Sequence, residues 1–334
     1  MWNIGLDLHR EFIVMAAVRD NGEIMEPVKI ACQETEAILE AIRSLAPFRA
    51  VIEASGTYRW LHDLLRPHGT ILLAHPLRLR AMIQRRSKTD KLDSQLLANL
   101  LRINQIPLAY VPPEPYQRLR DLVRCRARLG QDRARAKIKL RDMLARNNRQ
   151  SPCKTPFGPR GLAWFRGEDF GLVGNMLRDE LLARLAHYNR QINVFDEQLA
   201  RCGTDFPQTE AIADIHGIGL YSALLIVAEF GEVERFRTAK QVGAYAGLTS
   251  RVHQSGGHCY QGSITRQGSP WLRWILVEAA MKTVREDVAL KNFYTRVRKR
   301  SSAKIARVAA ARKLAEICWK RLRRWQREHA EKAA

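Results

Sequence analysis

Residues 3–30, NIGLDLHREFIVMAAVRDNGEIMEPVKI, contain the pattern that decides the fold of the N-terminal part of the chain. NIGLDL and FIVMAAV are short apolar runs of the kind that favours β-strands. The Asp-Asn-Gly at 20–22 is a turn signal, and it leads into a third run, EIMEPVKI. The stretch therefore predicts three consecutive strands.

The residues that follow alternate between helical and strand patterns. QETEAILEAIRSLA at 33–46 has helical spacing, whereas RAVIEA at 49–54 and TILLA at 70–74 are typical of buried strands. Three strands followed by a helix, a strand, a helix and a strand make an α/β layer with a mixed sheet. We assign this layer to a first domain at residues 1–104.

A basic region follows at residues 115–204. Residues 116–150 contain twelve Lys and Arg against three Asp and predict one long helix, with heptad spacing at Leu122, Leu129 and Met143. Residues 151–174 are rich in Pro and Gly, which predicts a loop or linker.

A second heptad seam lies beyond that linker. Its apolar residues are separated by alternating steps of four and three, which predicts a coiled coil with the preceding helix, with a second subunit, or with both. The alternative is a single amphipathic helix that lies on a domain. The seam residues are Leu181, Leu185, Tyr188, Ile192, Phe195 and Leu199.

Residues 205–330 predict a second, mostly helical domain, so the fold class is α/β plus all-α. Residues 209–232 have the pattern of a helix, a Gly-Ile-Gly turn and a helix, and QVGAYAGLTS at 241–250 predicts another helix. WLRWILVEAAMKTV and the basic KIARVAAARKLAEICWKRLRRW predict the last helices. Between them, VHQSGGHCYQGSITRQGSP at 252–270 has no helical period and is expected to be irregular.

The charge of the chain indicates a polyanionic partner. Lys and Arg number 56 against 34 acids, a formal net charge of +22, which favours nucleic acid first and an anionic membrane second. The sequence has no GxxxxGK[ST] motif, so strand chemistry would proceed without a P-loop and ATP.

The cysteines and the apolar runs point to a soluble, cytoplasmic protein. The six cysteines are scattered without a CxxC pair, which argues against a zinc site or a disulfide framework. The N-terminal MWNIGLDLHREF lacks a signal-peptide pattern, and no apolar run approaches the ~18 residues of a membrane helix.

Four acids in the first domain stand out by position. Asp7 lies in the apolar strand NIGLDL, Glu53 ends the strand RAVIEA, and Asp90 and Asp93 are three residues apart at a helix start. Each alone has an ordinary explanation as a cap, a dipole partner or a surface residue. Together they could converge on one pocket, where hard cations would neutralise them beside a phosphate backbone. The cluster therefore predicts Mg²⁺, with two ions clamping a scissile phosphate.

Ser255, in Gln-Ser-Gly-Gly, has two interpretations from the residues alone. Ser-Gly is ordinary turn chemistry, and a serine held on a loop can also be a nucleophile if a base, a metal or a nearby field activates it. The stretch by itself leaves both open.

Taken together, these motifs resemble the insertion-sequence transposases that include the Piv-like, bridge-RNA-guided recombinases. The resemblance rests on GLD at 5–7, IEASGTY at 52–58, KTDKLD at 88–93, HGIG at 216–219, AYAGLT at 244–249, and QSGG with GSITRQG at 254–268. It is specific as a combination and spans both domains. Ser94 stands where the family pattern has alanine, which is also small.

The resemblance implies an RNase H-like, RuvC-type first domain, in which Asp7, Glu53, Asp90 and Asp93 are the metal-binding D-E-D-D acids. It implies that Ser255 is the catalytic serine, which attacks a DNA phosphate and forms a transient phosphoserine link. It further implies double-stranded DNA at the element ends and target, a guide RNA, and a dimer or tetramer in which serine and acids come from different subunits.

Other residues are weaker candidates. The His-Gly-Ile-Gly turn, with Gly217 and Gly219, resembles a helix-hairpin-helix phosphate site, or needs glycine for steric reasons alone. Arg251 and Arg266 would stabilise charge on a phosphate. His253 and His258 flank Ser255, but histidines near a loop are more often structural.

The aromatic residues in 151–174 suit base stacking or, as the favoured interpretation, form a small core; they are Phe157, Trp164 and Phe165.

Two further hypotheses compete with a recombinase. An RNase H-like nuclease or junction resolvase would hydrolyse DNA with metal-bound water and would not need Ser255. A non-catalytic nucleic-acid scaffold would use its carboxylates only as caps and ion-pair partners.

Overall fold

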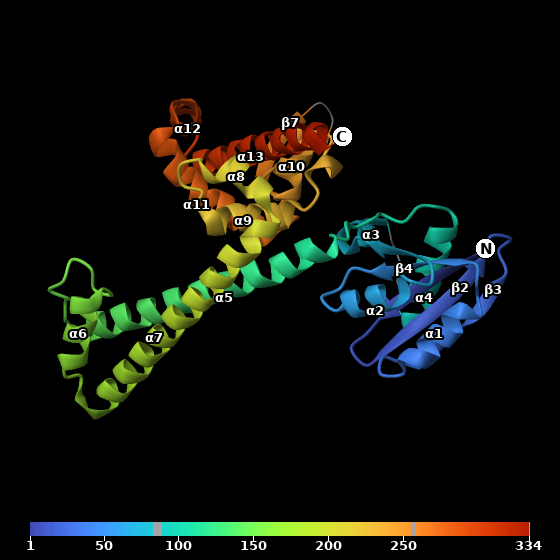
Figure 1. The fold of residues 1–334 in the computed structure, drawn as a ribbon, viewed down its shortest axis with the longest axis horizontal. Coiled ribbons are helices and arrows are strands. Elements are labelled where there is room, and N and C mark those ends of the chain that lie inside the picture. Colours follow the sequence, from blue (N-terminus) through green and yellow to red (C-terminus); the bar gives the residue numbers. More distant parts are fainter. Residues whose placement is uncertain (83–88, 256–257, 334) are drawn as a thin grey trace. The chain divides into compact units, whose positions relative to one another are not determined.

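The computed structural model describes residues 1–82, 89–255 and 258–333. The chain divides into two compact units, Met1–Val111 and Pro112–Ala334, and each is described by itself (Figure 1). No helix within the described ranges is long and apolar enough to span a membrane.

The first unit is built on a five-stranded mixed sheet, as the strand patterns predict. The strand order is β3-β2-β1-β4-β5, with β1 antiparallel to β2 and parallel to β4, and β4 parallel to β5. The strands are β1 (Trp2–Leu8), β2 (Phe12–Arg19), β3 (Ile24–Ala31), β4 (Phe48–Glu53) and β5 (Thr70–Ala74). The central strand β1 is therefore parallel to the neighbour on one side only.

Helices cover both faces of this sheet. They are α1 (Thr35–Arg43), α2 (Tyr58–Leu65), α3 (Pro76–Met82) and α4 (Asp90–Arg102). Alternate residues of a strand point to opposite faces, so Ile4 and Leu6 of β1 pack with α1 and α2. Val51 of β4 packs instead with Leu97 of α4 on the other face. The sheet is thus the middle layer of three.

Two long helices begin the second unit, and they lie side by side and antiparallel (Figure 1). They are α5 (Glu114–Arg146) and α7 (Gly171–Cys202). The basic segment 116–150 is indeed one helix. Arg126 of α5 forms an ion pair with Asp196 of α7, and Arg133 donates to Asn189, so residue numbers rise along one helix as they fall along the other.

The predicted apolar seams are only half buried in this pair. On α7, Leu185, Ile192 and Leu199 are buried, whereas Leu181, Tyr188 and Phe195 are partly exposed. On α5, Met143 is buried but Leu122 and Leu129 are partly exposed. The buried face of α5 is made by Leu119, Val123, Ala127, Ala136, Leu140, Met143 and Leu144.

Residues 151–174, expected to be a loop or linker, contain a helix and the start of another. Helix α6 spans Pro159–Gly167, and α7 begins at Gly171. Pro159 occupies the first helical position, where proline is tolerated because its missing N–H would have no partner there. Phe165 is completely buried, and the partly buried Phe157 and Trp164 pack against it, so these aromatics form a small core as favoured from the sequence.

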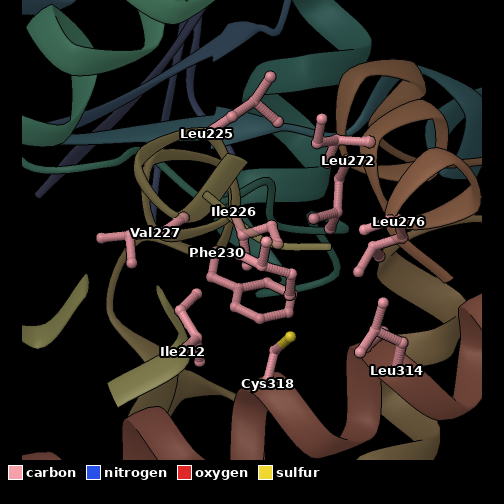
Figure 2. Close-up of a cluster of buried hydrophobic side chains, with 14 of the residues drawn as sticks. Ile212, Leu225, Ile226, Val227, Phe230, Leu272, Leu276, Leu314 and Cys318 are labelled. Atoms are coloured by element: carbon pink, nitrogen blue, oxygen red, sulfur yellow. The ribbon is translucent and has the colours of Figure 1, made fainter. Parts of the chain in front are cut away.

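The remaining helices form a compact bundle around one apolar core. They are α8 (Glu210–Ala213), α9 (Leu220–Phe230), α10 (Ala239–Tyr245), α11 (Pro270–Glu286), α12 (Val288–Arg300) and α13 (Ala303–Ala333), with short 3₁₀ turns at Gly203–Asp205, Pro207–Thr209 and Val233–Arg235. Phe230 of α9 and Leu276 of α11 lie in this core with Leu314 and Cys318 of α13 (Figure 2). Helix α12 was not among the predicted helices.

The stretch 252–270, expected to be irregular, forms most of a β-hairpin. Strand β6 (Ser250–Ser255) pairs antiparallel with β7 (His258–Ile264). The prediction failed because both strands are rich in polar residues and β7 contains a glycine, so they lack the apolar alternation that marks a half-buried strand. The two strands are held together by main-chain hydrogen bonds, which do not require a particular pattern of side chains.

Candidate functional site

Two acids lie at one edge of the N-terminal sheet. Leu6 of β1 is in register with Ile52 of the parallel strand β4. Asp7 follows Leu6 and Glu53 follows Ile52, so the two acids lie on neighbouring strands at the same level of the sheet. Both strands run toward the same edge. Because side chains alternate along a strand, Asp7 and Glu53 belong to the face that α4 covers.

Helix α4 brings the other two acids to this edge. Thr89 caps the helix, since its Oγ1 accepts a hydrogen bond from Leu92 N at 3.3 Å, and Asp90 and Asp93 lie in the first turn. The helix lies directly against β1 at Gly5, where an added Cβ would stand 2.1 Å from Ser94 O. Ser94 is completely buried, so a small side chain is needed at this contact.

The electrostatics of Asp7 link it to the two acids of α4, Asp90 and Asp93. Burial raises the pKa of the Asp7 carboxyl above its ordinary range, and the negative charges of Asp93 and Asp90 raise it further. His9 acts in the opposite direction, through its charge and a hydrogen bond. A carboxylate that is held partly desolvated beside two others is ready to accept a cation.

His9 is a member of the group that the sequence analysis did not single out. Its Nε2 lies 3.1 Å from Asp7 Oδ2 and 3.4 Å from Asp90 Oδ1. One ligand atom from each of Asp7, His9 and Asp90 lies within 4.8 Å of the other two, as a metal site requires. The signal in the sequence was its place two residues after Asp7, directly beyond the end of β1.

Ser255 is the last residue of β6, and its main chain pairs with that of His258. The side chains of Ser255, His253 and His258 lie outside the described residues, as do Gly256 and Gly257. The role of Ser255 as a nucleophile therefore stays a prediction. What the fold adds is its position at the end of a strand.

The two candidate arginines differ in their backbone setting. Arg251 is exposed on β6, where the strand register shifts between Ser250 and Val252. Arg266 is exposed beyond β7 with φ of 53°, and its carbonyl accepts a hydrogen bond from Arg273 Nη1 at 3.3 Å. Phosphate binding by either guanidinium stays a prediction.

The base of the hairpin is tied to the helical bundle through a buried carboxylate. Glu229 of α9 is completely buried, and Arg124 of α5 donates to its two carboxylate oxygens at 2.7 and 3.0 Å. Ser269 donates its hydroxyl to Glu229 at 2.8 Å and caps α11 by accepting from Leu272 N. The ion pair thus connects α5, α9 and the segment that leaves the hairpin.

The His-Gly-Ile-Gly turn joins α8 to α9, with a different setting for each glycine. Gly217 has φ of 93°, and an added Cβ would stand 2.7 Å from Lys282 Cβ and 3.0 Å from Ala279 O of α11. Close packing therefore accounts for Gly217 without a ligand. Gly219 precedes α9 and has no atom near the place of a Cβ, so this helix N-terminus is sterically open.

Helix α12 carries a strongly basic surface. Residues 288–315 contain nine Lys and Arg and no acid. Five of these basic residues are exposed on α12: Lys291, Arg296, Arg298, Lys299 and Arg300. A shallow hollow of about 360 Å³ is lined by Asn292, Thr295, Arg296, Lys299 and Arg300, a set that suits phosphate oxygens.

Comparison with known families identifies the chain. A family model described as "Transposase IS116/IS110/IS902 family" matches residues 209–295, and a second, the transposase domain DEDD_Tnp_IS110, matches residues 4–148. The chain belongs to the IS110/IS116/IS902 family of transposases. It is a DNA-processing enzyme, and its substrate is DNA.

Curated relatives of this transposase support the assignment over nearly its full length. It is 26% identical to a probable family 20 transposase of Pseudomonas aeruginosa, over 96% of each chain. It is 22% identical to the transposase for insertion sequence element IS1111A of Coxiella burnetii, over 96% of this chain and 89% of the relative. It is 26% identical to the pilin gene-inverting protein of Moraxella bovis, over 80% of this chain and 78% of the relative.

The two family matches divide the candidate residues of the transposase between them. The DEDD-type match, 4–148, contains all four acids and His9, and indicates dependence on a divalent metal. The second match, 209–295, contains Ser255 and the His-Gly-Ile-Gly turn. The candidate metal-binding acids and the candidate nucleophilic serine thus lie in two separately matched segments.

Proposed function

We propose that this transposase is a site-specific DNA recombinase that excises and inserts its own insertion sequence, guided by a bridge RNA. It cleaves DNA strands with Mg²⁺, forms a transient phosphoserine link and exchanges strands. The observation that carries the proposal is the convergence of Asp7, Asp90 and Asp93, with Glu53 on the neighbouring strand, at one edge of the sheet.

The donor set of this edge fits hard divalent cations. Carboxylate oxygens are the protein ligands that Mg²⁺ prefers, and Asp7, Glu53, Asp90 and Asp93 supply four carboxylates for two ions. When bound, the ions would neutralise the carboxylates and polarise the scissile phosphate. The strand order β3-β2-β1-β4-β5, with acids at the ends of β1 and β4, supports an RNase H-like, RuvC-type domain.

Ser255 acts as the nucleophile in this proposal. Its Oγ forms an ester bond to phosphorus while one bond from phosphorus to a deoxyribose oxygen breaks, and the proton that the serine hydroxyl loses passes to the released sugar oxygen. Attack by a sugar hydroxyl of another strand then reverses the step and frees the serine. The number of phosphodiester bonds is unchanged, so strand exchange needs no ATP.

The basic surfaces serve nucleic-acid binding. The exposed basic residues of α12 and the arginine-rich α5 bind the phosphate backbones of element-end DNA, target DNA and guide RNA. Gly219, at the open N-terminus of α9, together with Arg251 and Arg266 near the hairpin, adds phosphate contacts. The enzyme works in the cytoplasm as a homo-oligomer, with the partly exposed apolar residues of α7 available to a second subunit.

A denaturing gel tests the covalent step. Wild type is incubated with Mg²⁺, labelled element-end DNA and RNA from the flanks of the element, and a DNA species that migrates with the protein is expected. Ser255→Ala should abolish this species, and Ser263→Ala, an exposed serine on the same hairpin, should keep it. Asp90→Asn should abolish cleavage, whereas Asp63→Asn on α2 should not.

The competing nuclease hypothesis has its own signature in the same gel. If wild type cleaves without a protein-linked species and Ser255→Ala cleaves equally well, the enzyme is an RNase H-like endonuclease or Holliday-junction resolvase. If wild type and Asp90→Asn both bind nucleic acid and neither cleaves it, the protein would instead be a non-catalytic scaffold.

A further inference from the structure

His9 lies within ion-pair distance of two carboxylates of the acid group, Asp7 and Asp90. Its Nε2 is 3.1 Å from Asp7 Oδ2 and 3.4 Å from Asp90 Oδ1. All three side chains are reachable from solvent, with 35% of the His9 side chain exposed, 16% of Asp7 and 48% of Asp90. The group is therefore accessible to an ion, its waters and a phosphate.

The spacing of the three donors matches the edges of a coordination octahedron. With metal–ligand bonds of about 2.1 Å, adjacent ligand atoms of an octahedron are about 3.0 Å apart and opposite ones about 4.2 Å. The distances of 3.1 and 3.4 Å from the imidazole nitrogen are close to the adjacent spacing. Only small side-chain shifts are needed to bring the three atoms onto one ion.

The imidazole is held in this orientation by the turn between β1 and β2. His9 N donates to Phe12 O at 2.9 Å, which closes the turn. The His9 ring stacks on the Phe12 ring with centroids 4.6 Å apart, and Lys29 Nζ lies 3.6 Å from the centroid of Phe12. A ring fixed by stacking loses little conformational entropy when it binds an ion, so His9 is prepared as a ligand.

We propose that His9 donates an imidazole nitrogen to the ion that Asp7 and Asp90 bind, which makes this half of the metal centre a mixed nitrogen–oxygen site. The proposal rests on the metal dependence proposed above and adds a ligand to the four acids. Imidazole suits transition metals, whereas Mg²⁺ prefers oxygen. The site therefore binds Mn²⁺ in preference to Mg²⁺ by a wider margin than four carboxylates alone would give.

Electron paramagnetic resonance of Mn²⁺ bound to the full chain tests this ligand directly. Electron spin-echo modulation from a directly bound ¹⁴N nucleus is expected in wild type. His9→Ala should lose the modulation, and its Mn²⁺ affinity should fall by about tenfold or more, since removing even an outer-shell partner of a metal ligand typically costs that much. His68→Ala, an exposed histidine of the same unit, should leave both unchanged.

Competition between the two ions gives a second readout. The concentration of Mg²⁺ that displaces half of the bound Mn²⁺ should be higher in wild type than in His9→Ala, because the variant retains only oxygen ligands. An unchanged ratio would contradict the proposal. So would Mn²⁺ bound to wild type without ¹⁴N modulation, which would leave His9 as an ion-pair partner of the two acids.

The failure of His9 as a ligand can be distinguished from the failure of the metal centre. If Mn²⁺ binding is abolished by Asp7→Asn but wild type shows no ¹⁴N modulation, only the His9 proposal is wrong. If wild type binds no Mn²⁺, or Asp7→Asn binds it as well as wild type does, the acid cluster is no metal site and both proposals fall. The wild-type spectrum decides the ligand even if His9→Ala folds poorly.

Discussion

Gly5 of β1 lies against the backbone of Ser94 in α4, so closely that a Cβ on Gly5 would stand 2.1 Å from the Ser94 carbonyl oxygen and 2.5 Å from Ala98 N. Gly5 precedes Asp7 by two residues, and Ser94 follows Asp93 directly. The absence of one methyl group thus sets the distance between the strand and the helix that carry three of the four acids. In the proposed metal centre, Asp7 and the start of α4 share an ion, which the glycine of β1 at this contact allows.

Gly5→Ala should therefore weaken metal binding as well as the fold. The new methyl group has backbone atoms within contact distance, so α4 must move away from β1, at an expected cost of about 1–3 kcal/mol in the free energy of unfolding. Mn²⁺ affinity should fall with it, measured by titration. Gly56→Ala, where an added Cβ meets no atom within 4 Å, is the control and should change neither quantity appreciably.

Asp7 should make the metal-free protein less stable as the pH rises. Burial raises the pKa of its carboxyl above the ordinary value of 3.8, so the folded state binds this proton more tightly than the unfolded state does. The stabilisation is complete below the ordinary pKa and is lost as the pH rises through the raised value. Asp7→Asn should remove this loss, giving a higher melting temperature than wild type at neutral pH in EDTA.

Adding Mg²⁺ should reverse that order, because the ion stabilises wild type and not the variant. Asp20 provides a control of opposite sign, since hydrogen bonds from Asn3 and the N-terminal amine lower the pKa of its carboxyl. Its contribution is present above the ordinary pKa and is lost as the pH falls through the lowered one. A metal-free Asp7→Asn variant no more stable than wild type would contradict the raised pKa.

The ion pair between the buried Glu229 and the partly buried Arg124 should be costly to break. Glu229→Gln leaves the arginine without its charged partner and Ser269 with a weaker acceptor, so we expect a loss of about 3 kcal/mol in denaturant unfolding. Glu114→Gln removes an exposed pair with Arg118 of the same helix α5 and should cost less than about 1 kcal/mol. Equal effects of the two variants would show that the buried pair contributes little.

The basic face of α12 should contribute to DNA affinity through phosphate contacts. Replacing Arg296 and Lys299 together by Ala should weaken binding to all duplex sequences alike, and reduce the slope of log affinity against log salt by about two. Arg19 of β2 and Arg184 of α7 are also exposed, but each already pairs with a glutamate four residues away. Their double alanine variant should leave the slope nearly unchanged, and an α12 variant with wild-type slope would exclude this surface.

Local patterns were sufficient for the N-terminal sheet and for the long basic helix. Each strand there contains its own apolar run, and α5 has its charge pattern and no strand signal, so neighbours in the sequence carried the information. The same reasoning failed at α6, where Pro159 starts a helix instead of ending one. It failed again at β6 and β7, whose strands have no apolar alternation.

Burial along the long helices also depended on more than local spacing. Leu122 and Leu129 have the heptad spacing but are only partly buried, whereas Val123 and Ala127 face the protein interior. Helix α5 packs against α9 as well as α7, and the second partner turns a different face inward. The spacing of apolar residues can be read from the sequence of one helix, but the neighbouring helices determine which face of it is buried.

The sequence by itself determined the order of strands and helices from β1 to β5, the strongly basic charge and the four acids, because these follow from residue types and near-neighbour spacing; helix α3 was not predicted. Only the tertiary structure decided that α4 lies against Gly5 and that His9 lies between Asp7 and Asp90. The physical reason is distance along the chain. Asp7 and Asp90 are brought together by close packing of a helix on a strand, which no local pattern contains.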